Sequence, residues 1–492
     1  METEAAHRAI AASVARLMPQ ARAELAELVA FRSVADPVRF PGNDCDAAAD
    51  WLAATLRAEG FEDVALLDTP DGSRSVYGSL PGPPASPTVL LCAHYDVLPP
   101  LDESAWNTPP FTLTRRTDGR WYGRGAADCK GGILMHLLAL RALRAGGDLP
   151  VNVKLLVAGS QKRGTGGLER YARAHPELLA ADAVVIGATG NVRAGLPTVT
   201  SSVRGAVLAR VTVDPPGHTP DRTPAAYSAP YRAAQHTPDT LNTPHLPDTP
   251  DTPDALASLL RTLASLHDRE GNTVVDGLDC RGRWRGAPYP RRRFRRDAEV
   301  LYGVRLLGSD AIADRLWARP AATVVGLDCP PPGSGGSARA LLCLHVPPGT
   351  DTGTAAGLLA AHLESHAPWG ARIRCDIVGE TQPFGADTTS PVYTAMAEAM
   401  RQAYGQEMRV AGLGGPVPLC DTVAELCPRA EILLIGLAEP EARVHTDNES
   451  VDPRELERMS VTEALFLWRL RSRRRPCRPC SPARTVPLRS AP

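Results

Sequence analysis

The first 200 residues alternate between short apolar strand patterns and amphipathic helix patterns, and this alternation constrains the fold more than any other feature of the chain. The strand patterns lie at Thr88–Cys92, Val151–Val157 and Ala183–Ile186. The helix patterns that precede and separate them lie at Arg22–Phe31, Asp46–Glu59 and Gly131–Leu143. Strands that alternate with helices predict an α/β layer with a mainly parallel central sheet.

A different pattern begins near Gly205, where strands predominate and helices are fewer. The predicted elements are, in order, a strand at Ala206–Val213, a helix at Asp254–Leu266, strands at Ala322–Leu327 and Ala340–Val346, a helix at Thr354–Glu364 and a strand at Arg372–Ile377. Signals of the first kind return between Pro391 and Arg471. The order predicts a compact α+β unit inserted into the α/β domain.

The length of the chain supports this division, because 492 residues exceed what one hydrophobic core usually holds. We expect an α/β domain in two parts, at 1–203 and 381–472, with the inserted α+β domain between them at 204–380. A basic, proline-rich tail follows at 473–492. The tail and a segment rich in Thr, Pro and Asp at about 214–254 are predicted to be disordered, because neither has the apolar content of a packed core.

Charge and composition exclude several classes of protein. The formal net charge is −1, which gives no general attraction to nucleic acid or to an anionic membrane. The first 18 residues read as an amphipathic helix rather than a signal peptide, and no apolar run reaches the length of a membrane span. The 11 cysteines are scattered and odd in number, which fits reduced thiols in the cytoplasm better than a disulfide framework.

Three motifs place metal-binding residue types beside the predicted sheet. His94 and Asp96 follow a strand in LLCAHYDVLPP, Asp128 lies in the glycine-rich turn GRGAADCKGG, and His445 lies in the loop LAEPEARVHTDNES. Asp96 is spaced to hold the second imidazole nitrogen of His94. Each residue taken alone also has an ordinary explanation, since a loop histidine is common and an aspartate before a helix is often an N-cap.

In this order the three motifs resemble the metallohydrolase family of acetylornithine deacetylase, succinyl-diaminopimelate desuccinylase and carboxypeptidase G. The resemblance covers roughly residues 20–470. It implies a zinc-exopeptidase-like α/β domain interrupted by a smaller α+β dimerisation (lid) domain. It also implies two zinc ions held by His94, Asp128 and His445, with Asp128 bridging them, and hydrolysis of the amide bond of an N-acyl amino acid or short peptide.

Acidic positions of the family pattern are missing from this chain, and three of them concern the catalytic base and the zinc ligands. The family carries a segment like E-G-x-E-E-x-G-[ST]-x-G-L, whereas residues 158–168 read AGSQKRGTGGL. Gln161 stands where the resemblance implies the catalytic general base, and Lys162 where it implies a zinc ligand. Ala188 stands where it implies an acidic ligand of the other zinc.

These changes remove what a two-zinc hydrolase needs. A glutamine has no basic oxygen for proton transfer, a lysine ammonium offers only donors, and an alanine offers no ligand at all. Each zinc position keeps two protein ligands instead of the usual three. We therefore expect zinc to be absent or weakly bound. The three lost carboxylates and the gained ammonium of Lys162 also balance the loss of two divalent ions, so we expect Lys162 to pair with Asp128.

Weaker matches concern binding of the substrate. The glycine-rich loop that the resemblance implies near the substrate appears as GLGGPVP and contains Gly414 and Gly415. His345 stands where relatives carry an arginine for the substrate carboxylate. His218 is the best match to a histidine that the dimerisation domain lends to the neighbouring site, although an ordinary loop histidine explains it equally well.

Three hypotheses for function remain at this point. The first is a pseudoenzyme that forms a homodimer, or a heterodimer with an active paralogue, and binds a small acyl-amino-acid or peptide ligand. The second is a hydrolase that still acts with one loosely held metal ion. The third is metal-free chemistry in which Lys162 serves as base or nucleophile. The metal content of the purified protein separates the second hypothesis from the other two.

Overall fold

The structure is a computed structural model of the whole chain, and it describes residues 2–36, 38, 40, 44–147, 149–214, 254–329 and 336–471. The basic tail lies outside the described residues, as does the Thr/Pro/Asp-rich segment except for its ends, Asp214 and Asp254. His218 lies outside them as well, so its assignment stays a prediction.

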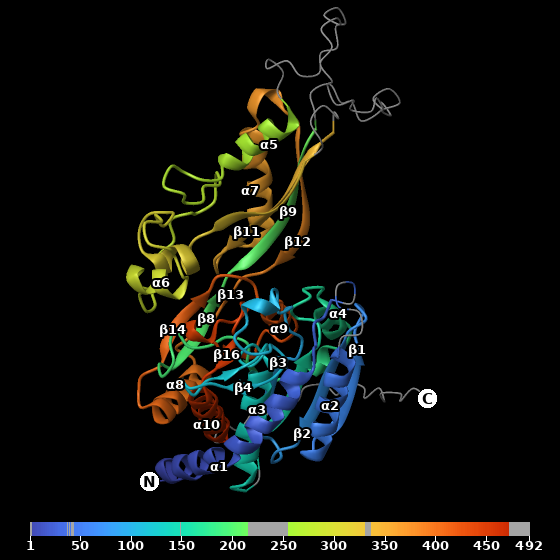
Figure 1. Cartoon of the computed structure of the whole chain (residues 1–492), viewed down its shortest axis with the longest axis vertical. Helices are drawn as coiled ribbons and strands as arrows, with labels where there is room; N and C mark the ends of the chain where they lie inside the picture. Colours follow the sequence, from blue (N-terminus) through green and yellow to red (C-terminus); the bar gives the residue numbers. More distant parts are fainter. Residues whose placement is uncertain are drawn as a thin grey trace, which may run out of the picture.

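The larger of two main sheets has nine strands and occupies the lower part of Figure 1. Its strands are, across the sheet, β1 (Glu62–Asp68), β2 (Arg74–Leu80), β6 (Asn152–Ala158), β3 (Thr88–His94), β7 (Ala183–Ile186), β15 (Glu431–Leu434), β8 (Thr198–Val203) and β13 (Phe384–Gly385), with β14 (Arg409–Leu413) also paired to β8. The central strands β6, β3, β7 and β15 are mutually parallel. Their carboxyl ends therefore meet at one edge of the sheet.

Helices cover both faces of this sheet, and the alternation of side chains along β3 shows why. Val89, Leu91 and Ala93 belong to one buried cluster, whereas Leu90 and Cys92 belong to the cluster on the other face. The first face is covered by α1 (Glu2–Ala30), α2 (Cys45–Ala58), α3 (Lys130–Arg144), α8 (Pro391–Tyr404) and α10 (Pro453–Leu470). The second face is covered by α4 (Gly167–Ala174) and α9 (Pro418–Leu426).

The smaller sheet is antiparallel and lies above the larger one in Figure 1. Its order is β10 (Ala321–Asp328), β11 (Ala338–Val346), β9 (Gly205–Val213) and β12 (Ile373–Thr381). Two helices, α5 (Ala255–Ala264) and α7 (Thr352–Ser365), pack on it around a hydrophobic cluster of its own. The chain between α5 and β10 contains α6 (Arg291–Asp297) and a short π-helix at Asp314–Ala318.

Short elements complete the described structure. A small third sheet consists of β4 (Thr114–Arg115), β5 (Trp121–Tyr122) and β16 (Ser450–Val451), and it brings the chain after His445 next to the turn that leads to Asp128. The 3-10 turns lie at Glu103–Ala105, Pro176–Leu178, Pro368–Gly370 and Pro440–Ala442. None of the described helices is both long enough and apolar enough to span a bilayer.

The predicted fold class is confirmed, and every element predicted for the inserted unit is present within a few residues of its expected bounds. One expectation needs correction. The N-terminal region is one continuous helix through Pro19, not two helices. Around the parallel middle of the central sheet, β1 and β2 form an antiparallel hairpin at one side, while at the other side β8 runs antiparallel to β15 and parallel to β14. A turn of a few residues can join strands only in the antiparallel sense.

Candidate metal centre

The candidate centre lies at the edge where the parallel strands of the large sheet end. His94 is the last residue of β3, and it is paired in register with Ala158 at the end of β6. The loop 159–165 therefore leaves the sheet beside His94. β7 ends at the same level, which places Gly187 and Ala188 at this edge, and the chain that follows β15 leads to His445. The pairing register of the parallel strands thus brings segments that are far apart in sequence to the same edge of the sheet.

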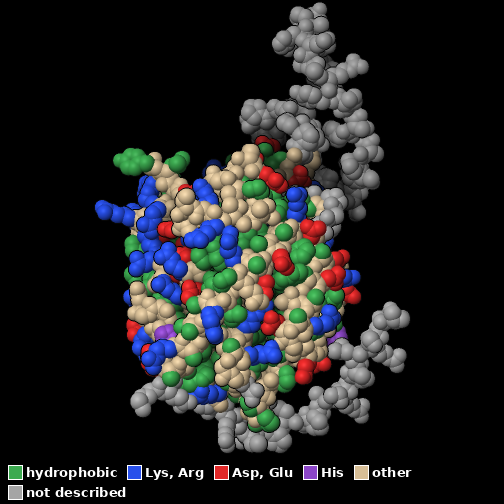
Figure 2. All heavy atoms as spheres, turned by 60° about the horizontal axis from the view of Figure 1, so that its bottom comes forward, with side chains coloured by type: hydrophobic (Ala, Val, Ile, Leu, Met, Phe, Trp, Pro, Cys, Tyr) green, Lys and Arg blue, Asp and Glu red, His purple; other side chains and the backbone are tan. Residues whose placement is uncertain are grey.

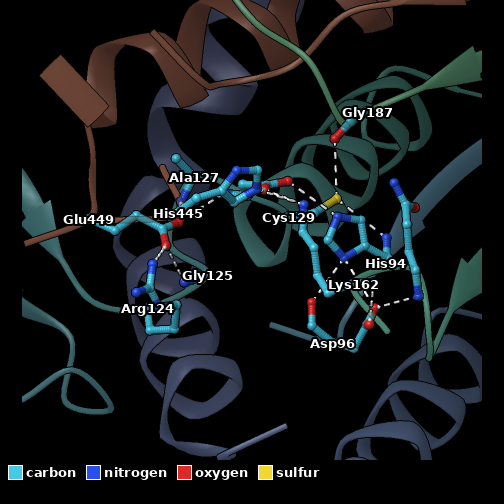
Figure 3. A network of polar contacts seen from close by, with 12 residues as sticks. His94, Asp96, Arg124, Gly125, Ala127, Cys129, Lys162, Gly187, His445 and Glu449 are labelled. Carbon is cyan, nitrogen blue, oxygen red and sulfur yellow. Dashed lines mark hydrogen bonds and ion pairs between the residues drawn. The ribbon is translucent and has the colours of Figure 1, made fainter. Parts of the chain in front are cut away.

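Four side chains meet at this edge, as the motifs predicted (Figure 3). The Nε2 atom of His94 lies 3.2 Å from Oδ1 of Asp128. The other oxygen, Oδ2, lies 2.6 Å from Nε2 of His445 and 2.6 Å from Nζ of Lys162. Nζ of Lys162 also lies 2.9 Å from Nε2 of His445. The predicted convergence and the predicted Lys162–Asp128 pair are therefore both present.

Asp96 fixes the loop that carries the changed residues. Its carboxylate accepts hydrogen bonds from the backbone amides of Gln161 and Lys162, at 3.1 and 2.6 Å. Its backbone carbonyl lies 3.0 Å from Nδ1 of His94, and its carboxylate lies 3.3 Å from the same nitrogen. Asp96 thus supports the imidazole as expected and also positions the segment that faces it.

The turn before Asp128 is held by Glu449, a residue that the sequence motifs did not single out. Its carboxylate accepts hydrogen bonds from the backbone amides of Gly125, Ala127 and Asp128, at 3.0 to 3.2 Å. It also pairs with Arg124 at 2.9 Å, and both side chains are only 1% exposed. Figure 3 shows Glu449 and Arg124 as a second group of polar contacts beside the first.

Cys129 and Ala188 lie on the His94 side of the centre. The thiol of Cys129 accepts a hydrogen bond from the backbone amide of His94 at 3.3 Å and donates one to the carbonyl of Gly187, also at 3.3 Å. Ala188 follows Gly187 directly and packs its methyl group against the two hydrophobic clusters of the large sheet. The position that should supply an acidic ligand therefore supplies only apolar surface.

Burial and charge act in opposite directions on the two central groups. Burial alone would raise the pKa of Asp128, but hydrogen bonds to His445 and His94 and the charges of His94 and Lys162 hold it well below its usual value. Burial alone would lower the pKa of His94, yet its interactions with Cys129, Asp128 and Asp96 hold it well above the usual value. The centre thus contains an ionised Asp128 surrounded by cationic groups.

The residues present do not fit two metal ions. A metal on the His445 side would need the lone pairs of His445 Nε2 and Asp128 Oδ2, and the ammonium of Lys162 lies within hydrogen-bond distance of both. An ammonium has no lone pair and repels a divalent cation. The His94 side differs, because ligand atoms of His94, Asp128 and Cys129 lie within 4.8 Å of one another. Three such ligands suit a single zinc ion.

The described candidates for substrate binding make contacts of their own. The ring nitrogens of His345 lie 3.9 and 3.7 Å from Sγ of Cys343, and burial, with the nearby Arg204, lowers its pKa. In the described structure His345 makes no hydrogen bond to the four-residue centre. The carbonyl of Gly414, which Gly415 follows, accepts a hydrogen bond from Nε of Arg204 at 2.8 Å. The roles proposed for His345, Gly414 and Gly415 stay predictions.

A cavity of about 630 Å³ lies between the two sheets, next to the centre. The α/β part contributes Ser160, Gln161 and Glu169 to its wall, and the small sheet contributes Leu208 and Cys343. The cavity therefore places Gln161 opposite the sheet that carries His345, and it is large enough for a dipeptide.

A second group of metal-type side chains, Asp276, His362 and His366, lies beside α7. Nδ1 of His362 accepts a hydrogen bond from the backbone amide of Asp276 at 3.1 Å, and Nε2 lies 3.1 Å from Oγ of Ser265. Both nitrogens of that ring are therefore already engaged, so this group needs no metal to explain it.

Comparison with known proteins gives one family. The family described as Peptidase family M20/M25/M40 matches residues 90–469. A cysteinylglycine-S-conjugate dipeptidase of Corynebacterium striatum is 37% identical over 458 residues, covering 90% of this chain and 94% of the relative. A β-Ala-His dipeptidase of Homo sapiens is 24% identical and covers 82% of this chain and 80% of the relative.

Solved structures show the same fold. The crystal structure of human carnosine dipeptidase 1 matches with a TM-score of 0.74 at 22% identity, covering 94% of this chain and 98% of that one. The dipeptidase Dug1p of Saccharomyces cerevisiae matches with a TM-score of 0.72 at 19% identity, covering 95% and 99%. With the extent of the family match and the 37% identical relative, these findings show that the chain belongs to peptidase family M20/M25/M40.

Proposed function

We propose that this chain binds a dipeptide in its cleft without hydrolysing it, with the ammonium of Lys162 in place of one metal ion. One observation carries the proposal: Nζ of Lys162 lies 2.6 Å from Asp128 and 2.9 Å from His445. A charged amine in that position forms hydrogen bonds with two groups that would otherwise bind a metal.

The residues around the cleft support loss of hydrolysis. Gln161 borders the cavity at the position where the family pattern places a general base, and a neutral amide cannot take a proton from water. Removing a general base typically costs about 10²- to 10⁴-fold in rate. The ammonium of Lys162 in addition opposes the approach of a second cation.

The choice of a dipeptide rests on the relatives. The Corynebacterium striatum protein is a cysteinylglycine-S-conjugate dipeptidase and several others are β-Ala-His dipeptidases, which favours a dipeptide over the N-acyl amino acid expected at first. The cavity between the two sheets has a volume suited to such a ligand. A dimer of two such chains, or with an active paralogue, remains part of the proposal. So does a cytoplasmic setting, which the nine free cysteines of the described chain support.

The test combines metal content, ligand binding and hydrolysis. After incubation with zinc and desalting, we expect less than one tightly held zinc ion per chain. We expect cysteinylglycine and β-Ala-His to raise the melting temperature without being cleaved. Two retained zinc ions, or cleavage that disappears in the variant His94→Ala, would overturn the proposal. So would the failure of every dipeptide tested to shift the melting temperature.

A restored variant shows whether the side chains alone are responsible. In Gln161→Glu/Lys162→Glu/Ala188→Asp the three acidic positions return to a backbone that the contacts of Asp96 and Glu449 already hold. We expect this variant to bind zinc and to gain about 2.7 kcal/mol of stability at zinc concentrations 100-fold above the dissociation constant. A folded triple variant that binds no zinc would show that the cleft geometry differs from that of an M20 metal centre. Ala181→Asp, on the part-buried chain just before β7, is a control for the added carboxylate.

A second candidate function is that of a dipeptidase with one metal ion. The observation in its favour is the His94, Asp128 and Cys129 group, which leaves room for an ion on the side away from Lys162. This function predicts one zinc ion per chain and slow cleavage of dipeptides. Cys129→Ser should then reduce both together, whereas the non-hydrolysing protein should lose neither.

A further inference from the structure

An arginine-rich segment, defined as residues 279–319, differs in charge from the rest of the chain. It contains eleven arginines, no lysine and five acidic residues, a net charge of +6 in a chain whose net charge is −1. The remainder of the chain is therefore acidic overall. The near-neutral total conceals a strongly basic region between α5 and β10.

Five of the eleven arginines of this segment are exposed and available to bind a partner. Arg283 and Arg296 are exposed but form ion pairs with acidic residues of the same segment. Five others are exposed and form no ion pair with any carboxylate that the structure describes: Arg281, Arg285, Arg291, Arg292 and Arg305. Arginine binds carboxylates through two parallel hydrogen bonds, so each of these five is a ready site for an anionic side chain.

Arg315 lies below this surface and adds to the excess of positive charge. Its Nε and Nη2 atoms are buried and have no hydrogen-bond partner. Burial lowers its pKa, and the neighbouring guanidinium groups of Arg291 and Arg319 lower it further. Buried donors without partners are costly, and like charges held together are unfavourable.

Exposed apolar side chains accompany the arginines. Leu301 is 76% exposed, Tyr302 is fully exposed and Leu307 is 71% exposed. Aromatic residues and arginine are the residue types enriched at sites of protein recognition. Figure 2 shows Lys and Arg side chains gathered on the left side of the molecule, the side on which α6 lies in Figure 1, below a projecting hydrophobic group.

The segment is also fastened next to the candidate centre. Glu299 forms an ion pair of 3.0 Å with Arg443, which lies two residues before His445. Trp317 packs on Ala411 and comes so close to Gly412, at the end of β14, that a side chain there would collide with it. The carbonyl of Arg319 accepts a hydrogen bond from Arg204 at 3.3 Å. The arginine-rich segment is therefore attached to the loop that carries His445.

We propose that the arginine-rich segment selects acidic peptides, whose carboxylate side chains bind the exposed arginines while one end of the peptide occupies the cleft. This inference rests on the proposed function, since it assigns the class of peptide that the same site takes. The contact with the His445 loop favours a peptide over a nucleic acid or an anionic membrane, because neither of these would need to lie beside the cleft.

The test compares fluorescent decapeptides that share one C-terminal dipeptide. One carries six glutamates, the second has glutamine at those six positions and the third has lysine. At low ionic strength we expect the glutamate peptide to bind at least about tenfold more tightly than the glutamine peptide, with the difference shrinking as salt is added. Equal affinities for the glutamate and glutamine peptides would overturn the inference.

Charge-reversal variants locate the effect. In Arg291→Glu/Arg292→Glu/Arg305→Glu all three sites are exposed, and two lie in the first turn of α6, where glutamate is favourable. We expect this variant to lose the preference for the glutamate peptide and to keep its affinity for the glutamine peptide. The control Arg8→Glu/Arg16→Glu/Arg22→Glu makes the same charge change on exposed positions of α1 and should keep the preference.

The remaining outcomes separate this inference from the proposed function. If the glutamate peptide binds through the segment while the glutamine peptide does not bind at all, the inference about the segment is supported and the proposal that the cleft binds dipeptides is contradicted. If both peptides bind equally and the triple variant changes neither affinity, the proposal of a peptide-binding cleft is supported and the inference about the segment is contradicted. Tighter binding of a decauridine RNA, or of vesicles with 30% phosphatidylserine, that is lost in the triple variant would overturn the assignment to acidic peptides.

Discussion

Two sets of residues around Asp128 can be compared: those that hold the backbone and those whose side chains face the candidate metal positions. The contacts that hold the backbone are complete: Glu449 binds three amides of the turn that ends at Asp128, and Asp96 binds the amides of Gln161 and Lys162. The side chains around the candidate metal positions differ from the predicted pattern, since Gln161, Lys162 and Ala188 offer an amide, an ammonium and a methyl group where the resemblance implied three carboxylates.

The difference shows that the shape of an active centre and its chemistry are maintained by separate residues. A buried carboxylate that binds several amides is needed for folding whether or not a metal is present, because amides without partners are costly to bury. A metal ligand has no such role in folding. A neighbouring cation can also interact with such a ligand, and the ammonium of Lys162 lies within hydrogen-bond distance of Asp128 and His445.

The largest effect is expected where the supporting contacts are broken. Glu449→Gln removes the charge from a pair with Arg124 in which both side chains are 1% exposed. Loss of one partner of a buried ion pair costs about 3–5 kcal/mol, and we expect that decrease in the free energy of unfolding, measured with urea. The double variant Arg124→Met/Glu449→Met should cost less, because it leaves no unpaired charge. A single variant within about 0.5 kcal/mol of the parent would contradict the supporting role.

A somewhat smaller effect is expected at the substituted centre. Lys162→Met removes the ammonium that lies 2.6 Å from Asp128, and we expect a loss of about 3 kcal/mol, at the lower end for buried pairs because the Lys162 side chain is 15% exposed. Lys162→Met/Asp128→Asn should recover part of this loss, because both charges are then absent. Thermal unfolding of the parent and the two variants measures the difference. Identical melting points for Lys162→Met and the parent would show that the ammonium does not replace a metal ion.

The smallest effect concerns a pair that joins the helix after Asp128 to the C-terminal helix. His136 on α3 lies 2.9 Å from Glu463 on α10, and although burial alone would lower the pKa of His136, Glu463 outweighs this and raises it. The folded pKa then exceeds the unfolded value of about 6.5, so the pair stabilises the fold below that pH and the gain is lost as pH rises through the folded pKa. The stability advantage of the parent over His136→Gln should fall by about 1 kcal/mol between pH 6 and pH 9.

An exposed histidine provides the control for this pH series. His175 lies 3.5 Å from Glu177, and its side chain is 41% exposed. The difference in unfolding free energy between the parent and His175→Gln is measured over the same pH range as a reference for losing a histidine at an exposed position. If the stability difference between the parent and His136→Gln does not change with pH, the His136–Glu463 pair is not a supporting contact.

The sequence predicted the parts of this molecule that depend on local pattern. Strands such as Val151–Val157 and the elements of the smaller unit were found because their apolar spacing is regular, and the meeting of His94, Asp128 and His445 followed from ordered motifs. Glu449 was missed because its partners are backbone amides, which leave no trace in sequence. The basic surface was missed because the net charge averages it with an acidic remainder.

The hydrogen bonds from two consecutive backbone amides to Asp96 have a consequence for protein engineering. An amide N–H is the same for every residue type except proline, so the loop keeps its course whichever side chains occupy positions 161 and 162. Position 162 faces Asp128 and His445, and position 161 borders the cavity, so the backbone presents both side chains to the candidate site. A library that varies position 161 and keeps Lys162 should therefore yield mostly folded proteins, and it would be a compact starting point for installing a new reactive group in this cleft.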